Sequence, residues 1–229
     1  MTISALLFDK DGTLFDFART WNGWSMSVLT DLAQGDAVRL MQMAESISYD
    51  LEAAAFRPDS IVIAGTNAEV AERLAPFVPQ MSEEALAAHL IRTASQAEIA
   101  QAVPLAPFLT GLKAQGLKVG VMTNDGEMSA RSHLSRSGVL DLFDMVIGAD
   151  SGFGAKPDPD PLLAFCRSVG VAPEVTAMVG DSRHDLLAGR AAGMRTIGVL
   201  TGMAGAEDLA DLADVVLPDI GHIPAWLLG

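Results

Sequence analysis

Short apolar runs alternate with helical stretches in the second half of the chain. The apolar runs predict strands at residues 118–124, 145–148, 175–180, 196–200 and 215–217. The stretches between them have the length and spacing of helices, at residues 127–137, 160–169 and 184–192. Strands that are apolar on both faces and alternate with helices are typical of a parallel sheet covered on both sides. The pattern therefore predicts an α/β fold with a Rossmann-like core, to which the apolar run 3–8 adds a first strand.

Residues of about 16–100 follow a different pattern, in which apolar positions recur at helical spacing. Helices are expected there at residues 24–32, 38–55, 68–77 and 83–99. Thr66 and Glu69 have the spacing of a capping box at the start of the third of these helices. Residues 59–65 fit either a short strand or an extended link. This part of the chain is therefore expected to be mostly helical.

The helical segment interrupts the α/β pattern and so predicts two domains. We expect a core domain made of residues 1–15 and 101–229, and a cap domain of residues 16–100 inserted into it. Pro104 and Pro107 mark the return of the chain to the core. A chain of 229 residues is long enough to bury a sizeable core.

Composition and charge narrow the class of protein. Half of the residues are apolar and 19% are charged, which is typical of a globular chain. No run approaches the ~20 apolar residues of a membrane span, and residues 3–8 are too short for a signal peptide, so a cytoplasmic protein without a membrane partner is expected. The net charge of −14, with scattered Lys and Arg, argues against a nucleic-acid partner. The single cysteine, Cys166, predicts a small buried side chain rather than a disulfide.

Polar side chains follow the predicted strands at the point where each strand ends. In parallel α/β sheets ligands bind beyond the carboxyl ends of the strands, so these side chains are expected to meet at one edge of the sheet. They describe a site and not a random surface. The set comprises Asp9, Asp11, Thr123, Asn124, Lys156, Asp181 and Asp185.

The residue types of this set favour one kind of chemistry. Neighbouring carboxylates are costly unless a cation neutralises them. Without a His or Cys cluster the ligands are hard oxygens, which suit Mg²⁺. A lysine and a hydroxyl at the same place would hold phosphate oxygens. The set therefore predicts phosphoryl transfer with Mg²⁺ as cofactor.

The same residues resemble the motifs of a known family. The segment FDKDGTL at residues 8–14 resembles the DxDGT signature of the haloacid dehalogenase (HAD) superfamily of phosphatases. Thr123-Asn124 is similar to its second motif, Ala155-Lys156-Pro157 to its third, and GDSRHD at residues 180–185 to its fourth. A helical insertion between the first two motifs resembles the C1-cap subgroup, which includes phosphoglycolate phosphatases and β-phosphoglucomutases.

The resemblance implies a role for each acid at the start of the chain. Asp9 would be the nucleophile that attacks phosphorus and forms an aspartyl-phosphate. Asp11 would protonate the leaving oxygen and then deprotonate the water that cleaves the intermediate. The function implied is a Mg²⁺-dependent phosphatase similar to phosphoglycolate phosphatase, with a small phosphorylated metabolite as substrate.

The resemblance also implies the metal and phosphate ligands. Mg²⁺ would be held by Asp9, the backbone carbonyl of Asp11 and Asp181, and Asp185 would support the metal shell or orient Lys156. Charge on the transferring group would be stabilised by three groups, namely Thr123, the backbone of Asn124 and Lys156.

Other functions stay open at this point. A phosphomutase or phosphotransferase of the β-phosphoglucomutase type would use the same core and pass the phosphoryl group to a sugar hydroxyl. A dehalogenase is disfavoured because it would need neither Asp11 nor the metal acids. A phospho-accepting signalling module similar to response-regulator receivers also combines aspartates, a lysine and Mg²⁺. The receiver would take up at most one phosphate per protein, whereas a phosphatase would release many.

The cap is expected to select the substrate. Polar or aromatic residues that could face the site are Trp21, Asn22, Trp24, Arg57 and Asn67. For the tryptophans, packing within the cap is the alternative, and Arg57 could grip a substrate carboxylate or a second phosphate.

A few charged residues near the motifs have simpler expected roles. Asp125 is interpreted as a turn residue, His184 as exposed, and Arg183 as part of a solvated face. Lys10 stands between the two aspartates, where many relatives have an apolar residue. Strand alternation predicts that Lys10 points away from the pocket and has a structural or surface role.

Overall fold

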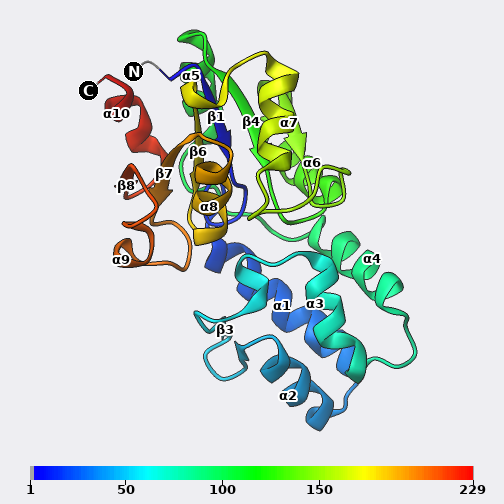
Figure 1. The fold of residues 1–229 in the computed structure, drawn as a ribbon. Helices are drawn as coiled ribbons and strands as arrows, with labels where there is room; N and C mark the ends of the chain where they lie inside the picture. Colours follow the sequence, from blue (N-terminus) through cyan, green and yellow to red (C-terminus); the bar gives the residue numbers. More distant parts are fainter. Residues whose placement is uncertain (1–2, 229) are drawn as a thin grey trace.

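The core is built on a parallel sheet. The computed structural model describes residues 3–228 and contains a six-stranded sheet in the order β5-β4-β1-β6-β7-β8, with every pairing parallel (Figure 1). The predicted strands are confirmed, with ends that shift by a residue or two. Their bounds are β1 Ala5–Phe8, β4 Lys118–Met122, β5 Met145–Ile147, β6 Thr176–Gly180, β7 Arg195–Val199 and β8 Val215–Leu217.

Both faces of the sheet are buried under helices, as predicted. Leu6 and Phe8 of β1 pack against α5 (Leu105–Ala114), α6 (Glu127–Arg136) and α10 (Ile223–Leu228). Ala5 and Leu7 pack on the opposite face against α7 (Asp160–Val169) and α8 (Arg183–Ala191). All four residues of β1 are fully buried, which agrees with a strand that is apolar on both faces. The α/β fold class with a Rossmann-like parallel core is confirmed.

The remaining elements of the core are short. A helix, α9 (Ala206–Leu209), precedes β8, and 3₁₀ turns lie at Leu140–Leu142, Pro173–Val175 and Ile220–His222. Cys166 is buried in α7, as expected for a small apolar side chain. Within residues 3–228, every helix is too short or too polar to cross a membrane.

The cap segment is mostly helical but departs from the predicted bounds. The first helix begins at Phe17 and not at residue 24, and the fourth ends at Ala94 and not at residue 99. The cap helices are α1 (Phe17–Ala33), α2 (Ala37–Ser46), α3 (Asn67–Leu74) and α4 (Glu83–Ala94), with a 3₁₀ turn at Ala75–Phe77. The capping box of Thr66 and Glu69 is present. The expected helix 38–55 is wrong beyond Ser46, and residues 59–65 form a 3₁₀ turn at Ile61–Ile63, neither strand nor extended link.

A small hairpin replaces the end of the expected helix. Ser48 has a φ of 52°, in the left-handed region, which ends the helical path. The strands β2 (Tyr49–Asp50) and β3 (Ala55–Phe56) then pair antiparallel. The rings of Tyr49 and Phe56 meet edge to face with centroids 5.0 Å apart. Aromatic packing across the hairpin therefore outweighs the helical spacing of the sequence.

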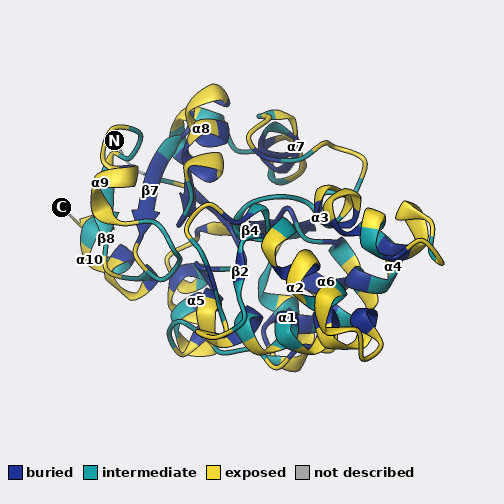
Figure 2. Cartoon of the chain, turned by 90° about the horizontal axis from the view of Figure 1, so that it is seen from below, coloured by how far each residue is buried: buried dark blue, intermediate teal, exposed yellow. Residues whose placement is uncertain are grey.

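The cap has a hydrophobic cluster of its own, which runs from Phe17 to Ala97 along the sequence. Exposed residues gather on the outer faces of the helices, whereas β7 of the sheet is buried (Figure 2). The two chain crossings between cap and core lie side by side, because Asp16 N donates to Ala100 O and Ala102 N donates to Leu14 O. The division into domains at 15/16 and 100/101 stays a prediction with which this arrangement agrees.

Candidate active site

The polar residues singled out in the sequence lie at the carboxyl edge of the sheet. Asp9 follows β1, Thr123 and Asn124 follow β4, and Asp181 follows β6. All four are at least nine-tenths buried. Lys156 comes from the loop between β5 and α7 and is also buried. The topology therefore brings together side chains that are up to 172 positions apart in the sequence, from Asp9 to Asp181.

The turn after β1 depends on a glycine. Gly12 has a φ of 79°, and a Cβ at this position would lie 2.2 Å from Asp181 Oδ2. Only glycine tolerates both the left-handed backbone and this approach. The hydroxyl of Thr13 donates to Asp181 Oδ1 at 3.1 Å, and Thr201 donates to the Gly12 carbonyl at 2.6 Å. Gly12 and Thr13 of the first motif thus hold the loop in contact with Asp181.

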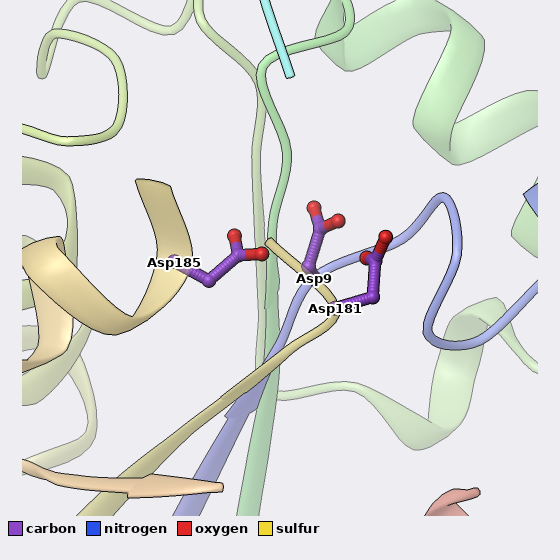
Figure 3. Close-up of side chains that lie close together, drawn as sticks. All are labelled: Asp9, Asp181 and Asp185. Carbon is purple, nitrogen blue, oxygen red and sulfur yellow. The ribbon is translucent and has the colours of Figure 1, made fainter. Parts of the chain in front are cut away.

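Three buried carboxylates share this edge. Asp9, Asp181 and Asp185 each offer one oxygen within 4.8 Å of the others. Figure 3 shows Asp9 between the other two carboxylates. Lys156 Nζ donates to Asp9 Oδ1 and to Asp185 Oδ1, both at 2.6 Å, and to the Met122 carbonyl at 3.0 Å. Lys156 is therefore paired directly with two of the three carboxylates, those of Asp9 and Asp185.

The electrostatics leave negative charge to be neutralised. Burial raises the pKa of Asp9 to about 7 although Lys156 opposes the shift. Burial, with Asp9 and Asp185 nearby, raises the pKa of Asp181 well above its usual value. Burial alone would lower the pKa of Lys156, but the two carboxylates it contacts outweigh burial and raise it. Carboxylate oxygens with uncompensated charge fit a hard divalent cation such as Mg²⁺.

The three acids differ in how many of their oxygens are engaged. Asp185 Oδ1 accepts from Lys156, and its Oδ2 accepts from Ser182 N at 3.0 Å and from Ser182 Oγ at 2.7 Å, as the capping box of α8. Among residues 3–228, no side chain or backbone group donates to Asp9 Oδ2 or Asp181 Oδ2. Asp9 and Asp181 therefore offer the open ligand atoms, and Asp185 orients Lys156.

The second motif fixes the lysine loop. Asn124 Oδ1 accepts from Lys156 N at 2.9 Å, and Asn124 Nδ2 donates to the Lys156 carbonyl at 2.9 Å. The same Nδ2 donates to the Ala64 carbonyl of the cap at 2.8 Å. The hydroxyl oxygen of Thr123 accepts from Asp125 N at 3.1 Å, which leaves its proton for another acceptor. The side chain of Asn124, and not only its backbone, thus belongs to the site.

Lys10 is not on the surface, and that part of the prediction is wrong. It is fully buried, and its Nζ lies 2.8 and 2.7 Å from the two carboxylate oxygens of Asp11. It also lies 3.1 Å from Asp125 Oδ2, 3.2 Å from His133 Nδ1 and 5.1 Å from the ring centroid of Trp21. Lys10 is not among the residues that line the pocket, and its buried contacts fit the structural role, the other of the two predicted.

Asp125 is also more than a turn residue. Its Oδ1 accepts from Asn67 Nδ2 and from Gly126 N, both at 2.7 Å, and its Oδ2 accepts from Ser129 Oγ at 2.6 Å. Burial alone would raise the pKa of this carboxyl, but Lys10 and these donors outweigh burial and lower it. Asp125 is therefore a buried carboxylate that joins the core to the cap.

A pocket lies between the carboxyl edge and the cap. Trp21, Trp24 and Asn67 line it, together with Asp9, Asp11, Thr123, Asn124 and Lys156. Asn22 and Arg57 are not among its lining residues. The Asn22 carbonyl accepts from the hydroxyl of Tyr49, and Arg57 pairs with Glu45 at 2.9 Å.

The two residues inside the fourth motif lie as expected. Arg183 and His184 are both exposed. Arg183 Nη1 and Nη2 donate to the two carboxylate oxygens of Asp211 at 2.6 and 2.8 Å. His184 also lines the pocket.

Sequence reasoning missed the group of Lys10, Asp125 and His133. The one signal in the sequence was the position of Lys10 between two aspartates at the end of a strand. A lysine buried there needs carboxylates as partners. Nothing in the pattern of α6 marks His133, which looks like any polar helical position. The indole Nε1 of Trp24, a buried donor without a partner among the described residues, was equally invisible.

Taken together, the parallel sheet and its buried acids define an α/β protein. Its acidic site, at the carboxyl edge of the sheet, could hold a cation. The model of the family described as haloacid dehalogenase-like hydrolase matches residues 6–199. This match spans most of the chain, and the protein belongs to that family.

Individual relatives agree with this assignment. The chain is 37% identical over 115 residues to the phosphoglycolate phosphatase of Neisseria meningitidis, a match that covers 49% of this chain and 48% of the relative. The chain thus spans about half the length of the curated relatives it matches. A β-phosphoglucomutase from Clostridium difficile has the same fold, with a TM-score of 0.68, 19% identity and coverage of 99% and 97%. So has a HAD phosphatase from Thermococcus onnurineus, with a TM-score of 0.63, 23% identity and 98% coverage of both chains.

Proposed function

We propose that the protein is a Mg²⁺-dependent phosphatase that hydrolyses a small phosphate monoester through an aspartyl-phosphate on Asp9, with machinery similar to that of phosphoglycolate phosphatase. The observation that carries the proposal is the position of Asp9. It is buried in the pocket wall at the end of β1, has one carboxylate oxygen without a protein partner, and is oriented through the other by Lys156. A cytoplasmic location stays a prediction from the sequence.

The reaction takes two displacements. First, an oxygen of Asp9 forms a bond to phosphorus while the bond from phosphorus to the leaving oxygen breaks, and Asp11 gives that oxygen a proton. Asp11 then takes a proton from water, whose oxygen bonds to phosphorus while the bond from phosphorus to Asp9 breaks. Both carboxyls return to their starting state, so the protein turns over.

The surrounding groups of the chain hold the transferring phosphoryl group. Lys156 lies beside Asp9, and the free hydroxyl proton of Thr123 and the backbone of Asn124 line the same pocket. Donors fixed in a buried site stabilise developing charge without reorganisation. Asp185 holds Lys156 in this position and keeps its ammonium charged.

The metal would be held chiefly by Asp9 and Asp181, with the Asp11 carbonyl as a further ligand and Asp185 beside them. When bound, Mg²⁺ would neutralise the carboxylates and the phosphoryl oxygens. The fit rests on the oxygen-only donor set and on the raised pKa values of Asp9 and Asp181.

The test is phosphate release from p-nitrophenyl phosphate at several concentrations of Mg²⁺. We expect many phosphates per protein, loss of turnover in excess EDTA, and loss of turnover in Asp9→Asn, with a cooperative melting transition in EDTA that shows the variant to be folded. Release of at most one phosphate would favour the receiver-like module instead. Full activity of Asp9→Asn would refute the proposed nucleophile. The phosphomutase alternative rests on likeness of fold, and net release of inorganic phosphate from a sugar phosphate would exclude it.

A further inference from the structure

The cap side of the pocket carries no charge. The cap contributes Phe17, Trp21, Trp24, Val62, Ile63, Ala64, Gly65, Asn67, Val70 and Ala94 to the lining. Within this set only Asn67 has an amide, and its Nδ2 is already bound to Asp125 at 2.7 Å. The surface that would face the leaving group is therefore mostly aliphatic and aromatic.

Two buried ammonium groups lie near the pocket, Lys156 in its lining and Lys10 outside it, and both are already paired. Lys156 contacts Asp9 and Asp185 at 2.6 Å each. Lys10 lies between Asp11 and Asp125, at 2.7 and 3.1 Å. Neither has charge to spare for a second anionic group of a substrate, and the carboxylates around them would repel one.

The neighbouring hollow offers no unpaired lysine or arginine among the described residues either. It is lined by Arg183 and His184 together with acids that include Asp59, Glu69 and Asp208. Both terminal nitrogens of Arg183 are held by Asp211. Arg57, the cap arginine that could have gripped a carboxylate, pairs with Glu45 and lies outside both sets of lining residues.

One buried donor on the cap side is unsatisfied. Trp24 lines the pocket, and its Nε1 has no hydrogen-bond partner among the described residues. A buried donor without a partner is costly, and a neutral oxygen of a ligand would satisfy it. An uncharged acceptor meets this need without bringing a second negative charge among the acids.

From these observations we infer the substrate class: a phosphate monoester of a small, uncharged and largely apolar alcohol, with no carboxylate or second phosphate. The inference rests on the proposed phosphatase function. It also separates this protein from phosphoglycolate phosphatases by substrate, because phosphoglycolate carries a carboxylate that would enter an apolar wall unpaired.

The experiment compares pairs of esters in which one member carries a carboxylate and the other does not. Ethyl phosphate is set against 2-phosphoglycolate, and benzyl phosphate against 4-carboxybenzyl phosphate, with saturating Mg²⁺. We expect kcat/KM to be at least about tenfold higher for the neutral member of each pair, since an unpaired charge in a buried site costs more than a contact gains. A carboxylated ester that equals or exceeds its neutral partner would overturn the inference.

Failure of the substrate class is distinguishable from failure of the proposed function. Turnover of p-nitrophenyl phosphate with none of the four esters would overturn the substrate class alone. No turnover of any ester, p-nitrophenyl phosphate included, would overturn the proposed phosphatase and the inference with it.

Variants of the cap wall provide an independent test. Val62→Arg and Ile63→Arg each place a cation in the lining, with Val62→Met and Ile63→Met as matched controls of similar reach. We expect at least one arginine variant to raise the ratio of kcat/KM for 2-phosphoglycolate over ethyl phosphate by about tenfold, and the methionine variants to leave it unchanged. Equal ratios in all four folded variants and the wild type would contradict the inference.

Discussion

Lys10 holds a buried positive charge on which several neighbours depend. Burial alone would lower its pKa, but the carboxylates of Asp11 and Asp125 outweigh burial and raise it. His133 shows the opposite effect, because burial and then Lys10 lower its pKa to about 4. The imidazole is therefore neutral at pH 7. Its Nε2 donates to the Ala94 carbonyl, which can only accept, and its Nδ1 accepts from Lys10.

Removing the charge of Lys10 is expected to destabilise the fold strongly. Lys10→Met leaves the buried Asp125 carboxylate without its cation, which costs about 3–5 kcal/mol of unfolding free energy. The control is Lys113→Met, since Lys113 forms an exposed pair with Asp144 that is worth about 0–1 kcal/mol. Urea unfolding measures both losses. Similar losses in the two variants would show that the buried contacts of Lys10 add no stability.

Asp9 and Asp181, the proposed Mg²⁺ ligands, have raised pKa values. These values predict how the stabilisation of the fold by Mg²⁺ depends on pH. In the folded, metal-free protein Asp9 binds a proton up to about pH 7, whereas an unfolded aspartate loses it near pH 4. The ionised carboxylates of Asp9 and Asp181 therefore destabilise the metal-free fold increasingly as the pH rises from about 4 through 7. Mg²⁺ binds the ionised form, so it should raise Tm more at pH 8 than at pH 5.

The measurement is the difference in Tm with and without Mg²⁺ at each pH. In this difference the effects on Tm of titrating groups remote from the site cancel. Asp181→Asn is the control and is expected to lose most of the difference at pH 8. An equal Tm shift at both pH values would contradict the account of the acids.

At the scale of elements, side chains of helix α6 hydrogen-bond backbone carbonyls at the C-terminal end of helix α4. Ser132 Oγ donates to the Ser95 carbonyl at 2.9 Å, and Arg136 Nη1 donates to the Ala97 carbonyl at 2.8 Å. His133 Nε2 lies between them in the sequence and donates to the Ala94 carbonyl at 2.7 Å. The last carbonyls of a helix lack partners within it. Side chains of α6 bind the last carbonyl of α4, at Ala94, the carbonyl of its C-cap residue Ser95, and the carbonyl of Ala97 just beyond the helix. In this way a core helix anchors a cap helix next to the site.

His133 should be the most costly of these contacts to remove. His133→Phe removes one of the two donors to the Ala94 carbonyl, which keeps Ala97 N at 3.0 Å, and one of the acceptors of Lys10. The expected loss for the two hydrogen bonds together is about 1–3 kcal/mol at pH 7. His222→Phe, at an exposed position, is the control and should change stability little.

The same variant has a pH signature. A histidine whose folded pKa is depressed contributes stability above the unfolded pKa near 6.5 and loses it as the pH falls toward about 4. The gap in unfolding free energy between wild type and His133→Phe should therefore narrow from pH 7 to pH 5. A gap that is constant over this range would mean that His133 is not held neutral.

The elements also show where sequence patterns stop being informative. The helices at 127–137 and 160–169 were predictable because apolar spacing and tertiary burial agree along them. The hairpin at Tyr49–Phe56 was not, because it depends on contacts outside the segment. Phe56 packs edge to face on Phe17 of α1 at 5.7 Å, and Tyr49 donates to the Asn22 carbonyl. Such contacts with α1 leave no periodic trace in the sequence.

At the scale of the whole molecule, hydrogen bonds between cap and core lie beside the pocket. Asn124 reaches the Ala64 carbonyl, and Asn67 reaches Asp125. The residues that order the catalytic loops therefore also hold the cap over them. We expect the position of the cap and the geometry of the site to be coupled for this reason.

The topology explains why the core residues could be predicted and the pocket wall could not. Carboxyl ends of parallel strands converge whatever the loops contain, so Asp9, Thr123 and Asp181 had to meet. The cap wall of the pocket depends on how three helices and a 3₁₀ turn pack together. That packing selected Val62 and Ile63 and left Arg57 outside, which no spacing rule foresees.

The central claim is that Asp9 becomes phosphorylated during turnover. The direct test uses Asp11→Asn with p-nitrophenyl phosphate and Mg²⁺, because this leaving group needs no proton whereas breakdown of the intermediate needs the base. After acid quenching and digestion, mass spectrometry should find one added HPO₃ on the peptide that contains Asp9, and none in the Asp9→Asn, Asp11→Asn double variant. A phosphorylated residue elsewhere, or turnover without any phosphorylated peptide, would contradict the account.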